Sequence, residues 1–254
     1  MPTAITRKVS DAIGRCELTH ISREPIDVRL AIRQHEAYER CLAELGCRVV
    51  SLSQEPDLPD SVFVEDTAVV VEELAVMTRP GAESRRAEVP SVARALAEYR
   101  PIAVIEAPGT LDGGDVLRLG RRVFVGLSAR TNAAGIGQLG SALARHGYSV
   151  EPVPVSGCLH LKSAVTQIAE DAVLVNPAWV DAAALDGFRR TEVDPAEQYA
   201  ANALLVADTA VYPLAFPRTA ARLERAGVRL ARLDLSELAK AEGGVTCCSL
   251  ILQD

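Results

Sequence analysis

The chain has 254 residues, of which 48% are hydrophobic, 24% charged and only 4% aromatic, a composition typical of globular proteins with a sizeable core. No stretch approaches the roughly 18 apolar residues of a membrane-spanning helix, and the N-terminal segment is charged, so we expect neither a transmembrane helix nor a signal peptide. The formal net charge of −7 with scattered basic residues argues against nucleic-acid binding, and the six cysteines are dilute, as in a reduced cytoplasmic protein.

The predicted elements follow a repeating order along the chain. The first three are a strand, a helix and a second strand, at Ala4–Lys8, Asp27–Leu45 and Arg48–Leu52. Four units follow, each with two short apolar strands joined by a tight turn, then a helix and a third strand. The hairpins are predicted at Thr67–Val71 with Ala75–Thr78, Val116–Leu119 with Val123–Gly126, Ala164–Ala169 with Ala172–Val175, and Ala203–Val206 with Ala210–Tyr212. The helices are predicted at Ser84–Tyr99, Thr131–His146, Asp181–Phe188 and Pro217–Ala226, and the third strands at Ile102–Glu106, Ser149–Val153, Phe188–Val193 and Arg229–Leu233.

The C-terminal apolar run Val245–Leu252 has no hairpin partner nearby, and joining it to the N-terminal elements completes a fifth unit. A repeat whose first and last units close on each other has no open sheet edges. We therefore expect an α/β fold in which five units form a closed ring, within a single domain that spans residues 1–254. An open α/β sheet with coincidental spacing is the alternative interpretation.

The loops that precede the hairpins carry the unusual polar residues, and a ring brings equivalent loops to the same end of its axis. In the last of these loops Cys247 follows Gly243 and Gly244, and small residues allow a sharp turn before a nucleophile. A lone cysteine is more often a buried apolar residue, but this one converges with acids and a histidine. If the segment is a strand, Cys248 points to the opposite face, so Cys247 is the preferred nucleophile.

His160 is the one histidine of four that falls in a repeat loop. A histidine between two leucines often makes only a structural hydrogen bond, whereas a cysteine–histidine pair oriented by a carboxylate is the general arrangement for covalent catalysis. Asp112, which is followed by Gly113 and Gly114, is the candidate residue for orienting the histidine ring.

Acidic residues are dense in two of these loops. They could serve as turn and cap residues, but their convergence favours a site for a cationic group, because carboxylates pair well with a planar guanidinium. Arg85 and Arg130 follow the second strands of two units and could bind a substrate carboxylate; surface salt bridges are the alternative. The acidic residues are Asp60, Glu65, Asp66 and Asp115.

Sequence patterns for cofactors are weak in this chain. The segment Gly135 to Gly140 matches the glycine pattern of dinucleotide sites, but it lies inside a predicted helix. Cys247, Cys248 and His160 could hold zinc, yet adjacent cysteines lack the spacing of structural zinc sites, so a bound metal would be inhibitory. We expect no metal and no other cofactor.

Five segments carry most of this chemistry: Asp60–Asp66, Arg79–Arg86, Leu111–Asp115, His160–Ser163 and Gly244–Ser249. Together they resemble the dimethylarginine dimethylaminohydrolase family of the guanidino-modifying, or pentein, superfamily. The similarity extends over essentially the whole chain in the correct order. It implies a five-bladed α/β-propeller of pseudo-fivefold ββαβ units closed by the N- and C-terminal strands, in agreement with the number of repeats.

The resemblance implies that Cys247 is the nucleophile, that His160 is the general acid and base, and that Asp112 orients His160. Some bacterial relatives have glutamate where this chain has Asp112, so the reach of the carboxylate is shorter here. Substrate binding is implied for further positions at both ends of the ligand. The guanidinium positions are Asp60 and Asp66 with Glu65 nearby, and the amino-acid positions are Arg85, Arg130 and the carbonyls of Leu18, in a loop expected to act as a lid, and Ala241.

The implied reaction converts asymmetric dimethylarginine and monomethylarginine to citrulline and dimethylamine or methylamine, through a covalent thiouronium intermediate on cysteine. The implied partner is therefore a small methylated arginine, without nucleic acid or membrane, in a cytoplasmic hydrolase of arginine metabolism and nitric oxide regulation; a homodimer is left open. An arginine or agmatine deiminase is the nearest alternative, although arginine deiminases have an inserted helical region for which this chain has no room. A non-catalytic module that binds guanidino compounds is the alternative from another class.

Overall fold

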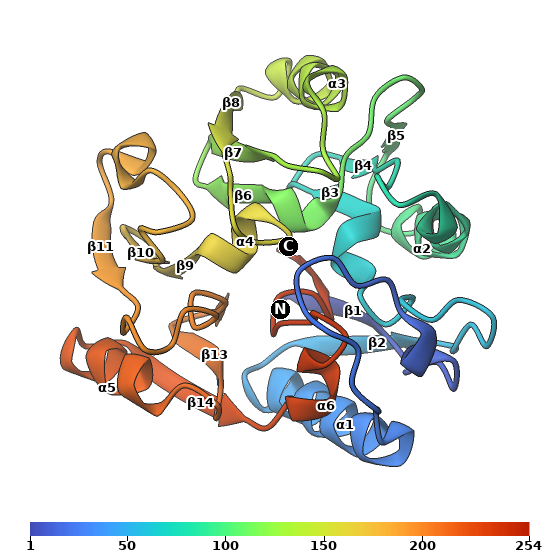
Figure 1. The fold of residues 1–254 in the computed structure, drawn as a ribbon. Coiled ribbons are helices and arrows are strands. Elements are labelled where there is room, and N and C mark those ends of the chain that lie inside the picture. Colours follow the sequence, from blue (N-terminus) through green and yellow to red (C-terminus); the bar gives the residue numbers. More distant parts are fainter. Residues whose placement is uncertain (254) are drawn as a thin grey trace.

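The computed structural model describes residues 1–253, with Ala182 described by its backbone alone. In this part of the chain the strands form five sheets of three strands each. Figure 1 shows the five sheets arranged around a common centre, with α1, α2, α3 and α5 toward the outside. The repeat predicted from the sequence is therefore present, with one sheet for each unit.

Four of the sheets have the same topology, in which a hairpin pairs antiparallel and the third strand adds in parallel to the second. A helical segment connects the second strand to the third, as parallel pairing requires a crossover. In chain order the sheets contain β3 (Ala68–Val70), β4 (Ala75–Met77) and β5 (Ile102–Val104); β6 (Val116–Leu119), β7 (Arg122–Leu127) and β8 (Ser149–Pro154); β9 (Val165–Ala169), β10 (Ala172–Val175) and β11 (Arg189–Glu192); and β12 (Leu204–Val206), β13 (Thr209–Pro213) and β14 (Arg229–Leu233).

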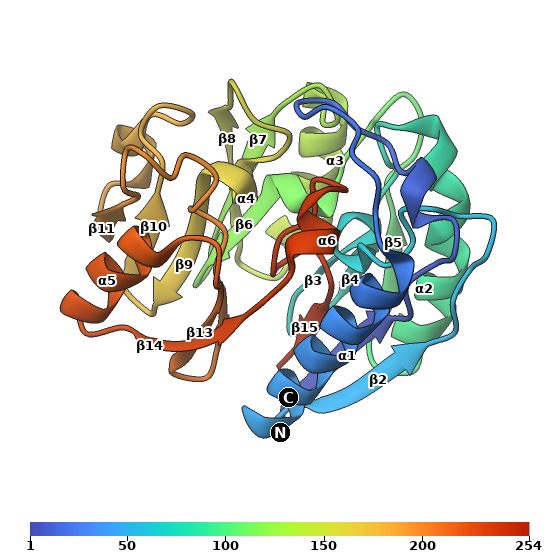
Figure 2. The same ribbon diagram turned by 60° about the horizontal axis from the view of Figure 1, so that its bottom comes forward.

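The fifth sheet combines both ends of the chain, as predicted. Its central strand β1 (Thr3–Arg7) pairs antiparallel with β15 (Leu250–Leu252) and parallel with β2 (Arg48–Leu52). Figure 2 shows the two termini side by side at the lower edge of the molecule. The N- and C-terminal segments thus build one unit of the same topology as the other four.

The helices begin and end close to the predicted limits where capping signals are clear. The Asp27 side chain accepts a hydrogen bond from the Leu30 amide and caps α1 (Val28–Glu44), and Asn132 caps α3 (Ala133–Ala144) in the same way through Gly135. The other two long helices are α2 (Val89–Leu96), which continues a 3-10 segment, and α5 (Pro217–Arg225), which begins with proline. Among the described residues, no helix is both long and apolar enough to cross a membrane.

Two predicted elements are wrong in extent. The predicted helix at Asp181–Phe188 is a single 3-10 segment, η5 (Ala182–Leu185), because so short a run provides too few turns for a stable α-helix. The predicted strand at Val245–Leu252 forms a strand only at β15, and its first residues make a turn. That turn contains Cys247 and Cys248, so strand alternation does not decide where their side chains point.

The core lies between neighbouring units as well as within them. Leu117 and Leu119 of β6, for example, share a buried cluster with Val165 of β9 and Val173 of β10. The first strands of the units also touch one another, since β9 contacts β6 and β12, and β15 contacts β3. Packing across the unit boundaries therefore fixes the positions of the loops that leave these strands.

Candidate active site

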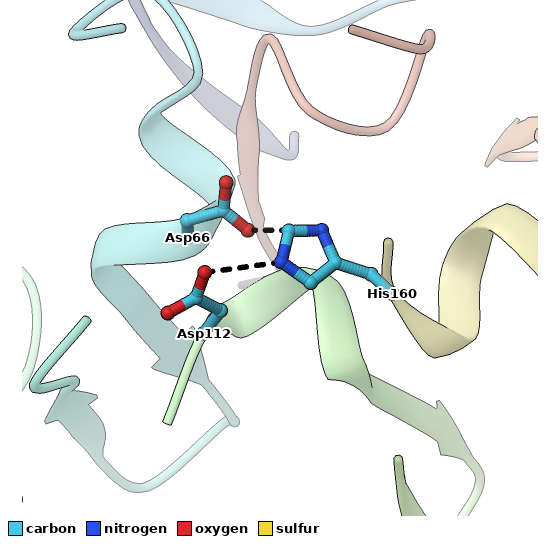
Figure 3. A group of neighbouring side chains, drawn as sticks. All are labelled: Asp66, Asp112 and His160. Atoms are coloured by element: carbon cyan, nitrogen blue, oxygen red, sulfur yellow. Dashed lines mark hydrogen bonds and ion pairs between the residues drawn. The ribbon is translucent and has the colours of Figure 1, made fainter. Parts of the chain in front are cut away.

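Three buried polar side chains from different units lie close together (Figure 3). Asp66 lies in the 3-10 segment η2 (Val64–Thr67), Asp112 is the N-cap of η4 (Gly113–Asp115), and His160 is the N-cap of α4 (Leu161–Ala164). One oxygen or nitrogen atom of each side chain lies within 4.8 Å of those of the other two. Residues almost a hundred positions apart in the chain are thus brought together by the repeat.

Asp112 holds the ring of His160 through one hydrogen bond. The Asp112 Oδ2 atom lies 3.0 Å from His160 Nε2, and the aspartate is fully buried. The other carboxylate oxygen accepts a hydrogen bond of 2.8 Å from the Gly81 amide, which fixes the carboxylate itself. The aspartate therefore reaches His160 directly, in the position where the resemblance implied an orienting carboxylate.

Asp66 lies beside Asp112 and faces the same edge of the imidazole (Figure 3), with its Oδ1 atom 3.8 Å from His160 Nδ1. It accepts hydrogen bonds from the Gly114 amide at 2.9 Å and from Arg85 Nη1 at 2.5 Å. A Cβ atom on Gly114 would stand only 2.6 Å from His160 Nδ1, so glycine is required at this position for the histidine and the aspartate to approach.

These contacts set the charges of the group. Burial alone would lower the pKa of His160, but the charge of Asp66 and the hydrogen bond that the ring donates to Asp112 outweigh it and raise that pKa to about 9. Burial opposes the ionisation of Asp66, yet the charges of His160 and Arg85 hold the pKa of its carboxyl well below the ordinary value. At neutral pH the imidazole is therefore a cation flanked by carboxylates, and it can donate a proton.

Cys247 lies in the turn just before β15, and its thiol is the one of the adjacent pair that reaches a cavity. The Gly244 amide donates a hydrogen bond to Cys247 Sγ at 3.3 Å. Burial, together with the charges of Glu65 and Asp66, raises the pKa of this thiol to about 12, so it is neutral at pH 7. Cys248 is fully buried in an apolar cluster and lines none of the described cavities that contain His160.

A narrow cavity joins these groups, and a larger cavity of about 280 Å³ adjoins it. Cys247, His160 and Glu242 contribute to the walls of both, whereas the carboxylates of Asp60 and Asp66 face only the narrow one. The narrow cavity is therefore the acidic side of the thiol. Its full lining is Glu17, Asp60, Phe63, Asp66, Arg85, Arg130, Leu159, His160, Ala241, Glu242, Gly243 and Cys247.

The two expected carboxylate-binding arginines both reach the narrow cavity, but they differ in their partners. Arg85 is buried and donates to both oxygens of Glu88, to Asp66 and to two backbone carbonyls, so most of its donors are already used. Arg130 donates one hydrogen bond to Thr19 Oγ1, and its Nη1 atom lies 3.8 Å from Asp112 Oδ2. The alternative of surface salt bridges is wrong for Arg85, because its ion pairs are buried.

Glu65 does not face the narrow cavity, contrary to the expectation that it lies near the bound guanidinium. Its two oxygens accept hydrogen bonds from Lys162 Nζ at 2.6 Å and from Thr246 Oγ1 at 2.8 Å. Glu65 and Lys162 line a separate cavity, bounded by the first strands of the units. The side chain turns away because the 3-10 geometry of η2 directs consecutive residues in different directions, and Glu65 and Asp66 diverge.

Of the two residues expected to offer backbone carbonyls, Ala241 lines the narrow cavity and Leu18 does not. Leu18 is half-buried next to Glu17, which lines the cavity. Four lining side chains were not predicted as site residues from the sequence: Glu17, Phe63, Leu159 and Glu242. Phe63 lies within the acidic loop, and each of the other three is adjacent to a predicted site residue, so position in the loops was the available signal.

A sequence model of the arginine deiminase family matches residues 55–201, which is more than half of the chain. N(G),N(G)-dimethylarginine dimethylaminohydrolase from Streptomyces coelicolor is 40% identical over 252 residues, covering 99% of this chain and 97% of that protein. The chain belongs to the dimethylarginine dimethylaminohydrolase family.

Solved structures of the family superpose closely on this chain. The enzyme from Pseudomonas aeruginosa, in a cysteine-to-serine mutant complexed with citrulline, has a TM-score of 0.93 at 33% identity and covers 98% of both chains. A histidine-to-glycine variant of a dimethylarginine dimethylaminohydrolase, as an adduct with S-methyl-L-thiocitrulline, also has a TM-score of 0.93, at 34% identity, covering 99% of this chain and 100% of that one. The fold is therefore the pentein fold.

The three buried side chains of Asp66, Asp112 and His160 also have the composition of a metal site, since each could offer one ligand atom. The carboxylate oxygens, however, already accept hydrogen bonds from Gly81, Gly114 and Arg85 and face the imidazole. The arrangement is that of an ion-pair network that fixes a histidine. The expectation of an inhibitory zinc on the two cysteines stays a prediction, with Cys248 buried away from the cavity.

Proposed function

We propose that this protein hydrolyses Nω-methylated arginines, namely asymmetric dimethylarginine and monomethylarginine, to citrulline and dimethylamine or methylamine. The observation that carries the proposal is a single narrow cavity whose wall contains a thiol, a cationic imidazole and the carboxylates of Asp60 and Asp66. A guanidinium is planar and cationic, and it can form paired hydrogen bonds with such carboxylates. The 40% sequence identity to N(G),N(G)-dimethylarginine dimethylaminohydrolase from Streptomyces coelicolor supports the same substrate.

In the proposed mechanism the thiolate of Cys247 attacks the guanidinium carbon. The carbon–nitrogen bond to the methylated nitrogen then breaks, and protonated His160 donates its proton to the departing amine. This leaves a thiouronium bound to the cysteine and a neutral imidazole. His160 next removes a proton from water, and the resulting hydroxide adds to the same carbon. The carbon–sulfur bond then breaks to release citrulline and the thiolate, and the proton of the added hydroxyl passes to solvent, where the released amine takes it up.

The pKa values indicate when the thiolate forms. Without a ligand, burial and the charges of Glu65 and Asp66 raise the pKa of Cys247 to about 12, which favours the neutral thiol. A cationic guanidinium placed against Asp66 offsets that charge, so we expect binding to lower the thiol pKa and release its proton to solvent. His160, with a pKa of about 9, is meanwhile already protonated for its role as acid.

The amino-acid end of the substrate is proposed to bind Arg130 and Arg85 through its carboxylate, and the carbonyls of Leu18 and Ala241 through its ammonium group. Arg130 has more donors to spare, so it is the stronger candidate. Arg85 contributes mainly by placing Asp66 and by its positive charge, because Glu88 takes two of its hydrogen bonds.

The wider expectations also stand as proposals. The pairing of β1 with β15 supports a propeller closed by the terminal strands, within one catalytic domain. We expect a small methylated arginine as the partner, a cytoplasmic location, and no nucleic acid, membrane or cofactor. Whether two copies form a homodimer is a matter for measurement of the mass in solution.

Arginine deimination is the second candidate, because the matching sequence model is that of the arginine deiminase family. The same thiol chemistry would release ammonia instead of an alkylamine. Both reactions on arginines give citrulline, so the substrate distinguishes them and the product does not.

A comparison of three substrates tests the proposal. Asymmetric dimethylarginine, arginine and agmatine are each incubated with the protein, and citrulline, carbamoylputrescine and dimethylamine are quantified by mass spectrometry. We expect citrulline and dimethylamine in equal amounts from dimethylarginine, and far slower turnover of the other two. Cys247→Ser should abolish turnover and Cys248→Ser should retain it. Faster turnover of arginine or agmatine, or activity that depends on Cys248, would contradict the proposal.

A further inference from the structure

The loop between β1 and α1 lies at one end of the molecule (Figure 2), and Glu17 of this loop lines the narrow cavity. Its first half is tied to the acidic side of that cavity. The Glu17 amide donates to the Asp60 carboxylate at 3.1 Å, and the Glu17 side chain accepts a hydrogen bond of 2.6 Å from Ser84 Oγ. The loop is therefore anchored at Glu17, beside the narrow cavity.

The second half of the loop is held by one side chain from the other end of the chain. Glu242 Oε2 accepts a hydrogen bond of 2.8 Å from the Thr19 amide, and Oε1 accepts one of 2.6 Å from the His20 amide. Because each oxygen takes one amide, the carboxylate fixes the orientation of two consecutive peptide units. Leu18 lies between the two attachment points of the loop.

The backbone of Glu242 is unusual. Its φ of +57° lies in the left-handed region, which is disfavoured for residues with a Cβ atom, and among the described residues only Ala207 is a further non-glycine example, with φ of +51°. A glycine would adopt this backbone conformation without strain. We infer that the hydrogen bonds of the Glu242 carboxylate to the loop offset the cost of the strained backbone.

We propose that Glu242 is a positioning residue that clamps the loop so that the Leu18 and Ala241 carbonyls face the substrate α-amino group together. Ala241 directly precedes Glu242 and lines the narrow cavity, and the two clamped amides directly follow Leu18. One side chain thereby sets the separation of two carbonyls that lie more than two hundred residues apart in the chain. The part of this inference that concerns the α-amino group rests on the proposed function.

The first test measures the clamp on the protein alone. Glu242→Gly removes both acceptors while suiting the left-handed backbone, and Ala207→Gly is the matched control that relieves the same kind of strain away from the loop. We expect hydrogen–deuterium exchange of the Thr19 and His20 amides to quicken at least tenfold in Glu242→Gly only. Unchanged exchange in that variant would overturn the clamp. If Glu242→Gly fails to fold, Glu242→Gln, which keeps one strong acceptor, serves in its place.

The second test links the clamp to the substrate. Dimethylarginine is compared with its analogue that lacks the α-amino group, in the wild-type protein and in Glu242→Gly. We expect Glu242→Gly to raise KM for dimethylarginine roughly tenfold with kcat within a few-fold, because the lost contact acts on binding and not on the thiol. The deamino analogue should react equally well with both proteins. Partial recovery of KM in Glu242→Gln would mark the acceptor itself as the cause.

The outcomes separate this inference from the proposed function. An equal loss with both substrates would mean that Glu242 has only a general structural role, and would overturn its link to the α-amino group. A wild-type protein that releases no citrulline would instead contradict the proposed function, and the exchange measurement would still decide whether the clamp exists.

Discussion

Asp112 and His160 are joined by a hydrogen bond of 3.0 Å between two side chains that are both removed from solvent. The Asp66 Oδ1 atom lies 3.8 Å from Nδ1 of the ring, so the imidazole faces two negative charges from different units. A cation in this place is stabilised as long as both carboxylates stay ionised. His160 therefore already carries the proton that the proposed reaction needs.

Asp112→Asn should slow the reaction by roughly a hundredfold or more, the scale expected when a general acid loses its proton and orientation. The hydrogen bond that His160 donates to Asp112 helps to raise the pKa of His160 to about 9, so kcat/KM should fall as pH rises through this value in the wild type. In the variant this limb should move to lower pH. A pH profile with an unmoved limb would show that another group controls it.

The same ion pairs should make stability depend on pH. His160 binds its proton more tightly in the folded state, with a pKa of about 9 against 6.5 for the ordinary value, so the stabilisation is complete below about pH 6.5 and lost as pH rises through 9. This shift corresponds to a contribution on the order of 3 kcal/mol. Urea unfolding between pH 6 and 10 measures it. His160→Asn should flatten the decline, whereas His146→Asn, outside this network, should not.

Lys162→Met should destabilise the protein by about 3 kcal/mol, because it leaves the buried Glu65 carboxylate without its charged partner. Burial already raises the pKa of Glu65, so the loss of folding stability in Lys162→Met should become smaller on acidification as that carboxyl takes up a proton. The double variant Glu65→Gln with Lys162→Met should recover most of the loss. Urea unfolding of the three variants decides this, and equal stability of Lys162→Met and wild type would refute it.

Gly114→Ala should lower kcat at least a hundredfold while the protein still folds, because the added methyl group would displace the imidazole of His160 or the carboxylate of Asp66. Gly137→Ala is the control, at an exposed position within α3 that has open space around it. It should retain activity and gain up to about 1 kcal/mol of stability from helix propensity. Activity assays and thermal unfolding of both variants provide the comparison.

Much of the fold followed from local apolar patterns. The hairpins and the third strands consist of short apolar runs between turn residues, and their limits agree with the structure within a few residues, as at Arg229–Leu233. The split fifth unit was also predictable, because Val245–Leu252 had no local partner. The helix at Asp181–Phe188 failed because composition alone does not show whether a short run has the packing to continue beyond one turn.

Convergence of the site could be predicted, but the direction of individual side chains could not. The repeat predicted that Cys247, His160, Asp66 and Asp112 lie together, since they fall in equivalent loops of successive units. Glu65 was misjudged because its true partner, Lys162, lies almost a hundred residues away and is itself part of another unit.

The partner of Arg85 was equally hidden. Glu88, three residues later, pairs with it only because a 3-10 segment places both side chains on the same side. Such pairings depend on the tertiary structure or on the local helix type, and neither was readable from single residue types.

The adjacency of β1 and β15 means that the order of the units in the gene is not required by the architecture. Thr3 pairs with Leu252, so a short linker could join the two ends, and new ends could be opened at the exposed turn around Gly120 between β6 and β7. Such a circular permutant should assemble the same pocket from a chain in which the second unit is divided. The permutant would keep the contacts between neighbouring units and change only the point at which the chain begins and ends.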